Sequence, residues 1–252
     1  LMYHDCAEAI LRIYEADPDG VVAGVNAMHV PLPPDHPDDP EALHPSIHGT
    51  TRQYGPTARM VRRILRAEDL FVPYDAEFPR HPLPPALRRP EIGTRELMAG
   101  WGMTFRRSIC EREPFDEIMT RYAAGEDSDM GYRASRHGLL LTALNGRLCH
   151  LGASGGRLNP FVVAALGNMN PLVLHRIYST DLERSMRLSR RLLARRMLIL
   201  LGKDLMQRNF TLPNARGILF ARQRMKEIFS KGPAELRAWY PEFQLRLIEQ
   251  YS

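Results

Sequence analysis

The stretch GEDSDMGYRASRHGLLLTALNGRLCH, residues 125–150, decides the fold class. Its acidic start and helical spacing predict a helix over Gly125–Arg136. The apolar run Leu139–Leu144 predicts a buried strand, Asn145-Gly146 predicts a turn, and Arg147–His150 continues as extended chain. A helix that leads directly into a buried strand is typical of an α/β domain.

The same pattern occurs earlier in the chain. Apolar residues at helical spacing between Ala7 and Tyr14 predict a helix, and Val21–Val25 predicts a short buried strand. Further on, Leu97–Phe105 predicts a strand and Phe115–Tyr122 a short helix. Because the helix and strand begin almost at once, we expect the front of this domain to precede Leu1.

Prolines mark a long interruption between these elements. Six prolines occur in residues 31–45 and six more in residues 73–90, which excludes regular helix or central strand there. Thr57–Ala67 predicts a helix between them. We therefore expect residues 31–95 to form a surface excursion, either a substrate-facing insert or a simple spacer.

The C-terminal part is helical by pattern, with helices expected at about 181–208, 216–230 and 233–250. The sequence thus predicts an α/β domain over residues 1–160 and an all-helical extension over residues 161–252.

Composition limits the class of protein. The chain has 252 residues, of which 44% are hydrophobic and 25% charged, and this is typical of a globular protein. Apolar runs such as Met197–Leu201 are too short to cross a bilayer, and the first ten residues do not resemble a signal peptide. Cys6, Cys110 and Cys149 lie far apart, as expected for free thiols in a reducing compartment. We therefore expect a cytoplasmic protein.

The net charge of +5 comes from one segment. Arg184–Arg208 holds eight basic residues and one acid and carries +7, so the rest of the chain carries −2. Several apolar residues of Leu182–Met206 lie near one stripe of the predicted helix. This helix either packs on the domain with solvated arginines or lies on an anionic membrane surface. Nucleic-acid binding is not expected, because interleaved aromatic residues and a known motif are missing.

Four motifs follow one another in the α/β part: GWGMTFRR at Gly100–Arg107, Phe115-Asp116-Glu117, GEDSDMGYR at Gly125–Arg133, and Cys149-His150. In this order and spacing they resemble the second half of a family 2 glycosyltransferase. The resemblance covers about residues 5–160 and is tightest over residues 97–152. It implies a GT-A fold, in which a Rossmann-like mixed sheet is flanked by helices. The family's donor-binding half, with its Asp-x-Asp motif, would precede residue 1, so the fold is expected to be N-terminally incomplete.

The resemblance also implies an activity. Such an enzyme transfers a sugar, with inversion, from a nucleoside-diphosphate donor to a carbohydrate or lipid-linked glycan acceptor, assisted by Mn²⁺ or Mg²⁺. One carboxylate base takes the proton of the acceptor hydroxyl. By the match to the family, Asp127 is the base with Glu126 beside it, and His150 ligates the metal or contacts the diphosphate. Substrate-binding residues by the same match are Gly100, Trp101, Gly102, Arg106 and Arg107.

Each of these residues also has a structural interpretation. Glu126 and Asp127 could cap a helix, Trp101 could belong to the core, Arg106 and Arg107 could be solvated, and His150 could be an ordinary loop residue.

Asp129 is not expected to share a metal with Asp127, since two positions on a helix are about 200° apart; it could pair with Arg133 instead.

The alternative function is a non-catalytic glycosyltransferase-like remnant that contacts partners or membranes through residues 182–208.

Overall fold

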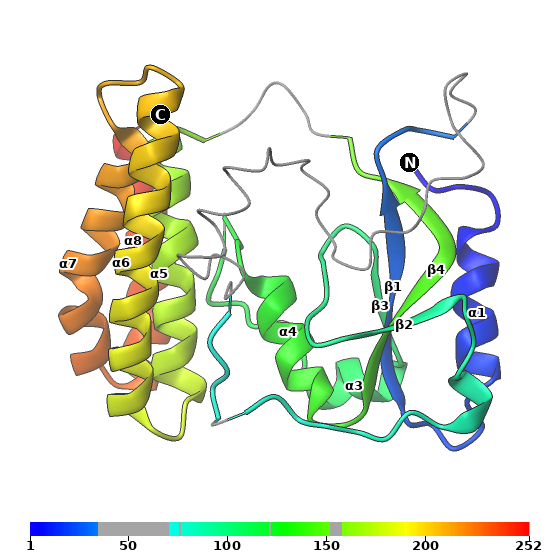
Figure 1. Ribbon diagram of the computed structural model, residues 1–252. Coiled ribbons are helices and arrows are strands. Elements are labelled where there is room, and N and C mark those ends of the chain that lie inside the picture. Colours follow the sequence, from blue (N-terminus) through cyan, green and yellow to red (C-terminus); the bar gives the residue numbers. More distant parts are fainter. Residues whose placement is uncertain (35–70, 76, 121, 152–157, 252) are drawn as a thin grey trace. The chain divides into compact units, whose positions relative to one another are not determined.

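The chain folds into two compact units, which we treat separately. The structure, a computed structural model, describes residues 1–34, 71–75, 77–120, 122–151 and 158–251 (Figure 1). The sheet unit comprises Leu1–Arg52, Phe78–Phe115 and Glu126–Ser154. The helical unit comprises Gln53–Glu77, Asp116–Gly125 and Gly155–Ser252. The expected helix Thr57–Ala67 lies outside the described residues.

The sheet unit is a mixed α/β structure built on four strands. Their order is β2-β4-β1-β3, where β1 is Val22–Val30, β2 Ile92–Arg95, β3 Met103–Phe105 and β4 Leu139–Cys149. The central pair, β1 and β4, is parallel, and both outer strands are antiparallel to their neighbours. The α/β class expected from the sequence is therefore confirmed.

Helices cover both faces of this sheet, which is why β1 is buried along almost its whole length. Helix α1 (Cys6–Glu15) packs on one face, and α3 (Arg107–Arg112) and α4 (Glu126–Ser135) lie on the other (Figure 1). Alternate residues of the strands feed the two layers of the core. Val22 and Leu141 face α1, whereas their neighbours Ala23 and Leu140 face α4.

Two expectations about strands are wrong. The predicted strand Leu97–Phe105 is regular only over β3, and residues 96–102 form a loop. The predicted excursion over residues 31–95 contains β2 at its end, because Ile92–Arg95 pairs with Leu140–Ala143 of β4.

Two more local predictions need correction. The turn predicted at Asn145-Gly146 lies inside the continuous strand β4: Ala27 pairs with Ala143 and Met28 with Arg147, so residues 144–146 form a bulge. The helix predicted at Phe115–Tyr122 is not formed over its described residues.

Instead of a helix, the segment 116–120 forms a turn that Asp116 fastens to the helical unit. The Asp116 carboxylate accepts hydrogen bonds from the Ile118 backbone (3.0 Å), from both terminal nitrogens of Arg237 (2.7 and 3.0 Å) and from the Tyr178 hydroxyl (2.6 Å).

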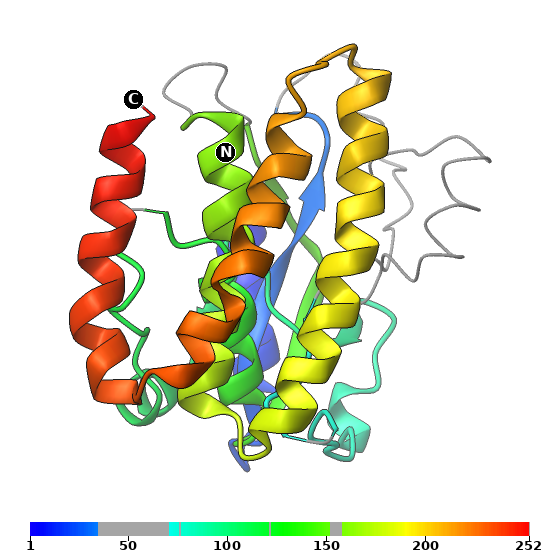
Figure 2. The ribbon, with the colours of Figure 1, turned by 90° about the vertical axis from the view of Figure 1, so that its left-hand side faces the viewer.

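The described part of the helical unit contains four long helices: α5 (Pro160–Tyr178), α6 (Leu182–Met206), α7 (Pro213–Ser230) and α8 (Pro233–Gln250). Helix α7 packs against both α5 and α6, and α8 packs against α5 (Figure 2). Gly217 allows the close approach of α7 to α5, since a Cβ there would lie 2.6 Å from the Cβ of Ala164. The last three helices confirm the sequence prediction to within a few residues. No helix in the described part of the chain is long and apolar enough to cross a membrane.

Candidate functional site

The candidate site lies where the two parallel strands end. The carboxyl ends of β1 and β4 meet at one edge of the sheet, which is where α/β proteins generally bind ligands. Helix α4 leads back into β4 through a short turn, so its amino end lies at the same edge. Asp127, in the first turn of α4, is therefore at this edge.

A loop over residues 96–102 runs along α4 and is held at three points. A Cβ on Gly131 would lie 2.8 Å from the Met98 nitrogen, so the loop backbone lies directly against the helix. The buried Asn26 side chain donates to the Ala99 carbonyl (3.2 Å) and accepts from the Ala99 N–H (2.8 Å). The Gly102 carbonyl accepts from Ala27 of β1 (2.7 Å). These contacts fix the loop in one conformation.

The loop presents a backbone donor to Asp127. The Gly100 N–H donates to Oδ2 of Asp127 at 3.0 Å, and the Ser128 N–H donates to Oδ1 at 2.8 Å. The structure thus brings Gly100 and Asp127, two of the predicted site residues, into contact. Gly102 packs closely on β1, since a Cβ there would lie 3.0 Å from the Ala27 Cβ and could fit only with a small shift.

Charges near Asp127 affect each other. Partial burial and the charge of Asp127 both raise the pKa of the exposed Glu126 carboxyl. Burial lowers the pKa of Arg95, at the end of β2, and the charge of Asp127 acts in the opposite direction. Arg95 is thus a positive charge close enough for Asp127 to affect its titration.

Two histidines and a tryptophan gather at the same edge. The rings of His29 on β1 and Trp101 meet edge to face, with centroids 5.2 Å apart. Burial and the charge of His150 both lower the pKa of His29, which favours the neutral imidazole at neutral pH. His150 itself is exposed just after β4, and Trp101 is partly buried against the core on the α1 side. Trp101 therefore has both a core contact and a place at the site.

Arg106 and Arg107 are not brought to Asp127. Arg106 lies at the amino end of β1, where its Nε donates to the Val22 carbonyl (2.9 Å) and its Nη2 to Asp17 Oδ2 (2.8 Å). Arg107 has a side chain that is 92% exposed, in a loose ion pair with Glu111 (3.3 Å).

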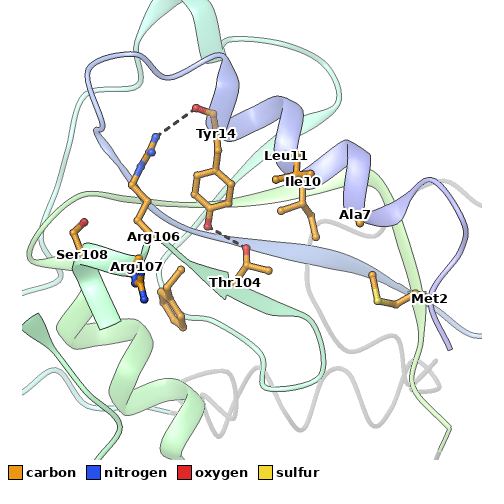
Figure 3. A pocket seen from close by; sticks show the side chains of 10 residues that line it. Met2, Ala7, Ile10, Leu11, Tyr14, Thr104, Arg106, Arg107 and Ser108 are labelled. Atoms are coloured by element: carbon orange, nitrogen blue, oxygen red, sulfur yellow. Dashed lines mark hydrogen bonds between the residues drawn. The ribbon is translucent and has the colours of Figure 1, made fainter. Parts of the chain in front are cut away.

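Both arginines line a separate groove of about 710 Å³ between α1 and β3 (Figure 3). Its walls are mostly apolar, with Ile10 and Leu11 on one side. A hydrogen bond of 3.0 Å between the Tyr14 hydroxyl and the Thr104 Oγ1 joins α1 to β3 beside it.

Asp129 has a structural role, as the helical geometry predicts. Its Oδ2 accepts from Nε (3.0 Å) and Nη2 (2.8 Å) of Arg133, and both side chains are buried. Arg133 also donates to Glu113 at 3.0 Å. Burial raises the pKa of Glu113, but hydrogen bonds from His137 and Arg133 outweigh it and leave the pKa below its usual value. This network fixes α4 and therefore the position of Asp127.

Three residues that hold or influence the site were missed by the sequence analysis: Asn26, His29 and Arg95. A polar residue inside the apolar strand β1 was a usable sign for Asn26, which is fully buried. His29 carries no local sign, because only the pairing of β1 with β4 brings it to this edge. Arg95 carries none either: it pairs with Leu140 near the amino end of β4 and interacts with Asp127 through its charge.

No group of three histidine, cysteine, aspartate or glutamate residues within the described ranges could hold a metal ion. His150, with His29 near it, could supply imidazole ligands. These residues alone do not make a complete metal centre.

Comparison with protein-family models, curated proteins and solved structures gave no match to this chain. The family resemblance therefore rests on the ordered motifs, and the function is argued from the site itself.

Proposed function

We propose that the protein is an inverting glycosyltransferase with a GT-A-like sheet unit, in which Asp127 is the general base. The observation that carries the proposal is the contact between Gly100 and Asp127 at the carboxyl edge of the parallel strands. It joins two of the motifs on which the family resemblance depends. The donor is a nucleoside-diphosphate sugar, and the acceptor is a carbohydrate or a lipid-linked glycan.

The environment of Asp127 suits a base. The side chain is half-buried, and Oδ2 accepts one hydrogen bond, from Gly100, which leaves a lone pair for an acceptor hydroxyl. Asp127 lies in the first turn of α4, where the positive end of the helix dipole can stabilise negative charge. Inverting transfer needs only one such base, which takes the hydroxyl proton as the oxygen attacks the sugar.

The other residues of the edge would bind the substrate. Trp101 can offer part of its ring to a sugar or a base, and the exposed Gly100 lets a substrate approach the loop backbone. Arg106 and Arg107 are given no role at this edge, since they lie at the amino end of β1. Arg95 pairs with Leu140 near the amino end of β4 and interacts with Asp127 through its charge.

A divalent metal belongs to the proposal only through His150. When bound with a donor, such an ion neutralises charge on the leaving diphosphate. Most of its ligands would have to come from the diphosphate or from outside the described residues, because His150 and His29 do not complete a centre.

Two measurements test the proposal. Thermal unfolding of the chain is followed with Mn²⁺ and a panel of UDP, GDP and dTDP sugars, where a ligand at about 100 times its dissociation constant stabilises by about 2.7 kcal/mol. Sugar transfer is then measured for Asp127→Asn and for Glu126→Gln, its neighbour on the same helical turn.

The Asn side chain can still accept the Gly100 N–H but cannot act as a base. We expect Asp127→Asn to lower transfer by at least about 100-fold with donor binding intact, and Glu126→Gln to have a small effect. Retained transfer in Asp127→Asn would refute the assignment of the base. If no donor shifts the unfolding temperature, the non-catalytic alternative is favoured.

A further inference from the structure

The most exposed of the large apolar side chains in the described helical unit lie at the carboxyl end of α6 and directly after it. Met206 is 86% exposed, Phe210 76%, Leu198 57% and Leu205 50%. Leu198 and Leu205 are seven residues apart and lie on one face of α6. Gly202 lies between them on this face, and a Cβ there would meet no atom within 4 Å. This face is therefore uncovered by the described residues.

Among the described residues, the exposed charged side chains at the carboxyl end of α6 itself are basic. Lys203 and Arg208 are exposed, and neither forms an ion pair with a residue that the structure describes. Asp204 is the only acid between Glu183 and Glu227. It is fully buried, and its two oxygens accept from the Asn214 amide (2.6 Å) and the Ala215 N–H (3.0 Å).

This surface, which we call the α6 tip, comprises Leu198, Lys203, Leu205, Met206, Arg208 and Phe210. It stands at the end of the helical unit where α5 begins and α8 ends (Figures 1 and 2). A projecting turn with apolar side chains can enter a bilayer interface, while cations around it meet lipid phosphates. Binding to a nucleic acid does not require exposed apolar side chains. Binding to an acidic protein does not require apolar side chains that project from the end of a helix.

We propose that the α6 tip docks the protein on an anionic lipid bilayer, with Leu205, Met206 and Phe210 in the interface and Lys203 and Arg208 on the headgroups. The arginines further back on the same face of α6, Arg187 and Arg191, are also exposed and add to the attraction at longer range. The inference goes beyond glycosyl transfer and does not depend on it.

Co-sedimentation of the full chain with vesicles tests this inference. One set of vesicles is pure phosphatidylcholine, and the other contains about 30 mol% phosphatidylglycerol to give the surface a negative potential. We expect binding to the anionic vesicles and little or none to the neutral ones. Added salt should weaken the binding, because it screens the surface charge.

Matched variants locate the surface. Met206→Ser/Phe210→Ser should weaken binding at least about tenfold, because two large apolar side chains no longer enter the interface. Lys203→Gln/Arg208→Gln should weaken it about fivefold for each charge removed. The control Arg222→Gln/Lys226→Gln removes the same charge from exposed positions of α7. The control Leu219→Ser removes an apolar side chain that is 41% exposed on α7.

Both controls should bind like the wild type, and circular dichroism confirms that every variant is folded. Absence of binding to anionic vesicles overturns the proposal and leaves the tip as a protein contact. Equal losses in the tip and control variants also overturn it, because the attraction would then be spread over the unit.

Discussion

His175 should make the stability of the helical unit depend on pH. The side chain is 2% exposed on α5, its Nδ1 is 2.7 Å from the Ser179 Oγ, and its ring meets the Tyr74 ring edge to face at 5.0 Å. Burial and the charge of Arg184 lower its pKa from 6.5 to about 4, although a hydrogen bond with the Val72 backbone acts in the opposite direction. The folded chain thus keeps this imidazole neutral.

The size of the effect follows from proton linkage. Between pH 6.5 and pH 4, the unfolded chain binds a proton at His175 that the folded chain does not. The free energy of unfolding therefore falls as the pH falls through this window. A pKa difference of about 2.5 is worth about 3 kcal/mol at 1.36 kcal/mol per pKa unit. Above the window, and below it, this group contributes no further change.

Urea unfolding of the wild type and of His175→Asn measures the effect at several pH values between about 7.5 and about 4.5. The Asn side chain can still pair with Ser179 but does not titrate. We expect the difference in unfolding free energy between the two chains to shrink by about 2 to 3 kcal/mol as the pH falls. Carboxylates such as Glu113 and Asp116 titrate in both chains, so their contributions cancel. A difference that stays constant over this range would refute the reasoning.

Two further predictions concern packing in the helical unit. Gly202→Ala should raise the free energy of unfolding by up to about 1 kcal/mol, because alanine favours the helix more than glycine and its Cβ would meet no other atom. Gly217→Ala should instead lower the free energy of unfolding by about 1 to 3 kcal/mol, because its Cβ would overlap Ala164. Equal effects of the two substitutions in urea unfolding would contradict this. Asp204→Asn should lower the free energy of unfolding by about 1 to 3 kcal/mol, since the new amide cannot accept from both the Asn214 amide and the Ala215 N–H. An unchanged thermal midpoint would argue that these two bonds contribute little.

The helices were predictable because their determinants are local. The helix expected at about 181–208 is α6, Leu182–Met206, and the one expected at 233–250 is α8. In each, the helical spacing of apolar residues extends over several turns. Prolines and an Asp cap mark the starts: Asp181 accepts from the Arg184 N–H at 2.9 Å. No distant contact is needed to predict these boundaries.

The loop over residues 96–102 was not predictable, because distant residues determine its conformation. The Asn26 side chain, 73 positions earlier in the chain, hydrogen-bonds to Ala99. The Met98 backbone packs closely on α4 at Gly131, which has no side chain in the way. Apolar composition alone favoured a strand there. Arg106 shows the same limit at the level of function. Its basic charge favoured a phosphate contact, but Asp17, 89 positions earlier, takes that side chain.

Two carboxylates of the motif set show how the surroundings separate a structural acid from a candidate base. Asp116 accepts four hydrogen bonds, two at each oxygen, so no lone pair remains for a substrate hydroxyl. Burial raises its pKa, but the bonds from Arg237 and Tyr178 outweigh it, so the pKa lies below its usual value. In Asp127, Oδ2 accepts one hydrogen bond, from a backbone N–H. Both residues occur in motifs of equal rank in the sequence, and only the occupancy of their oxygens favours Asp127 as the base.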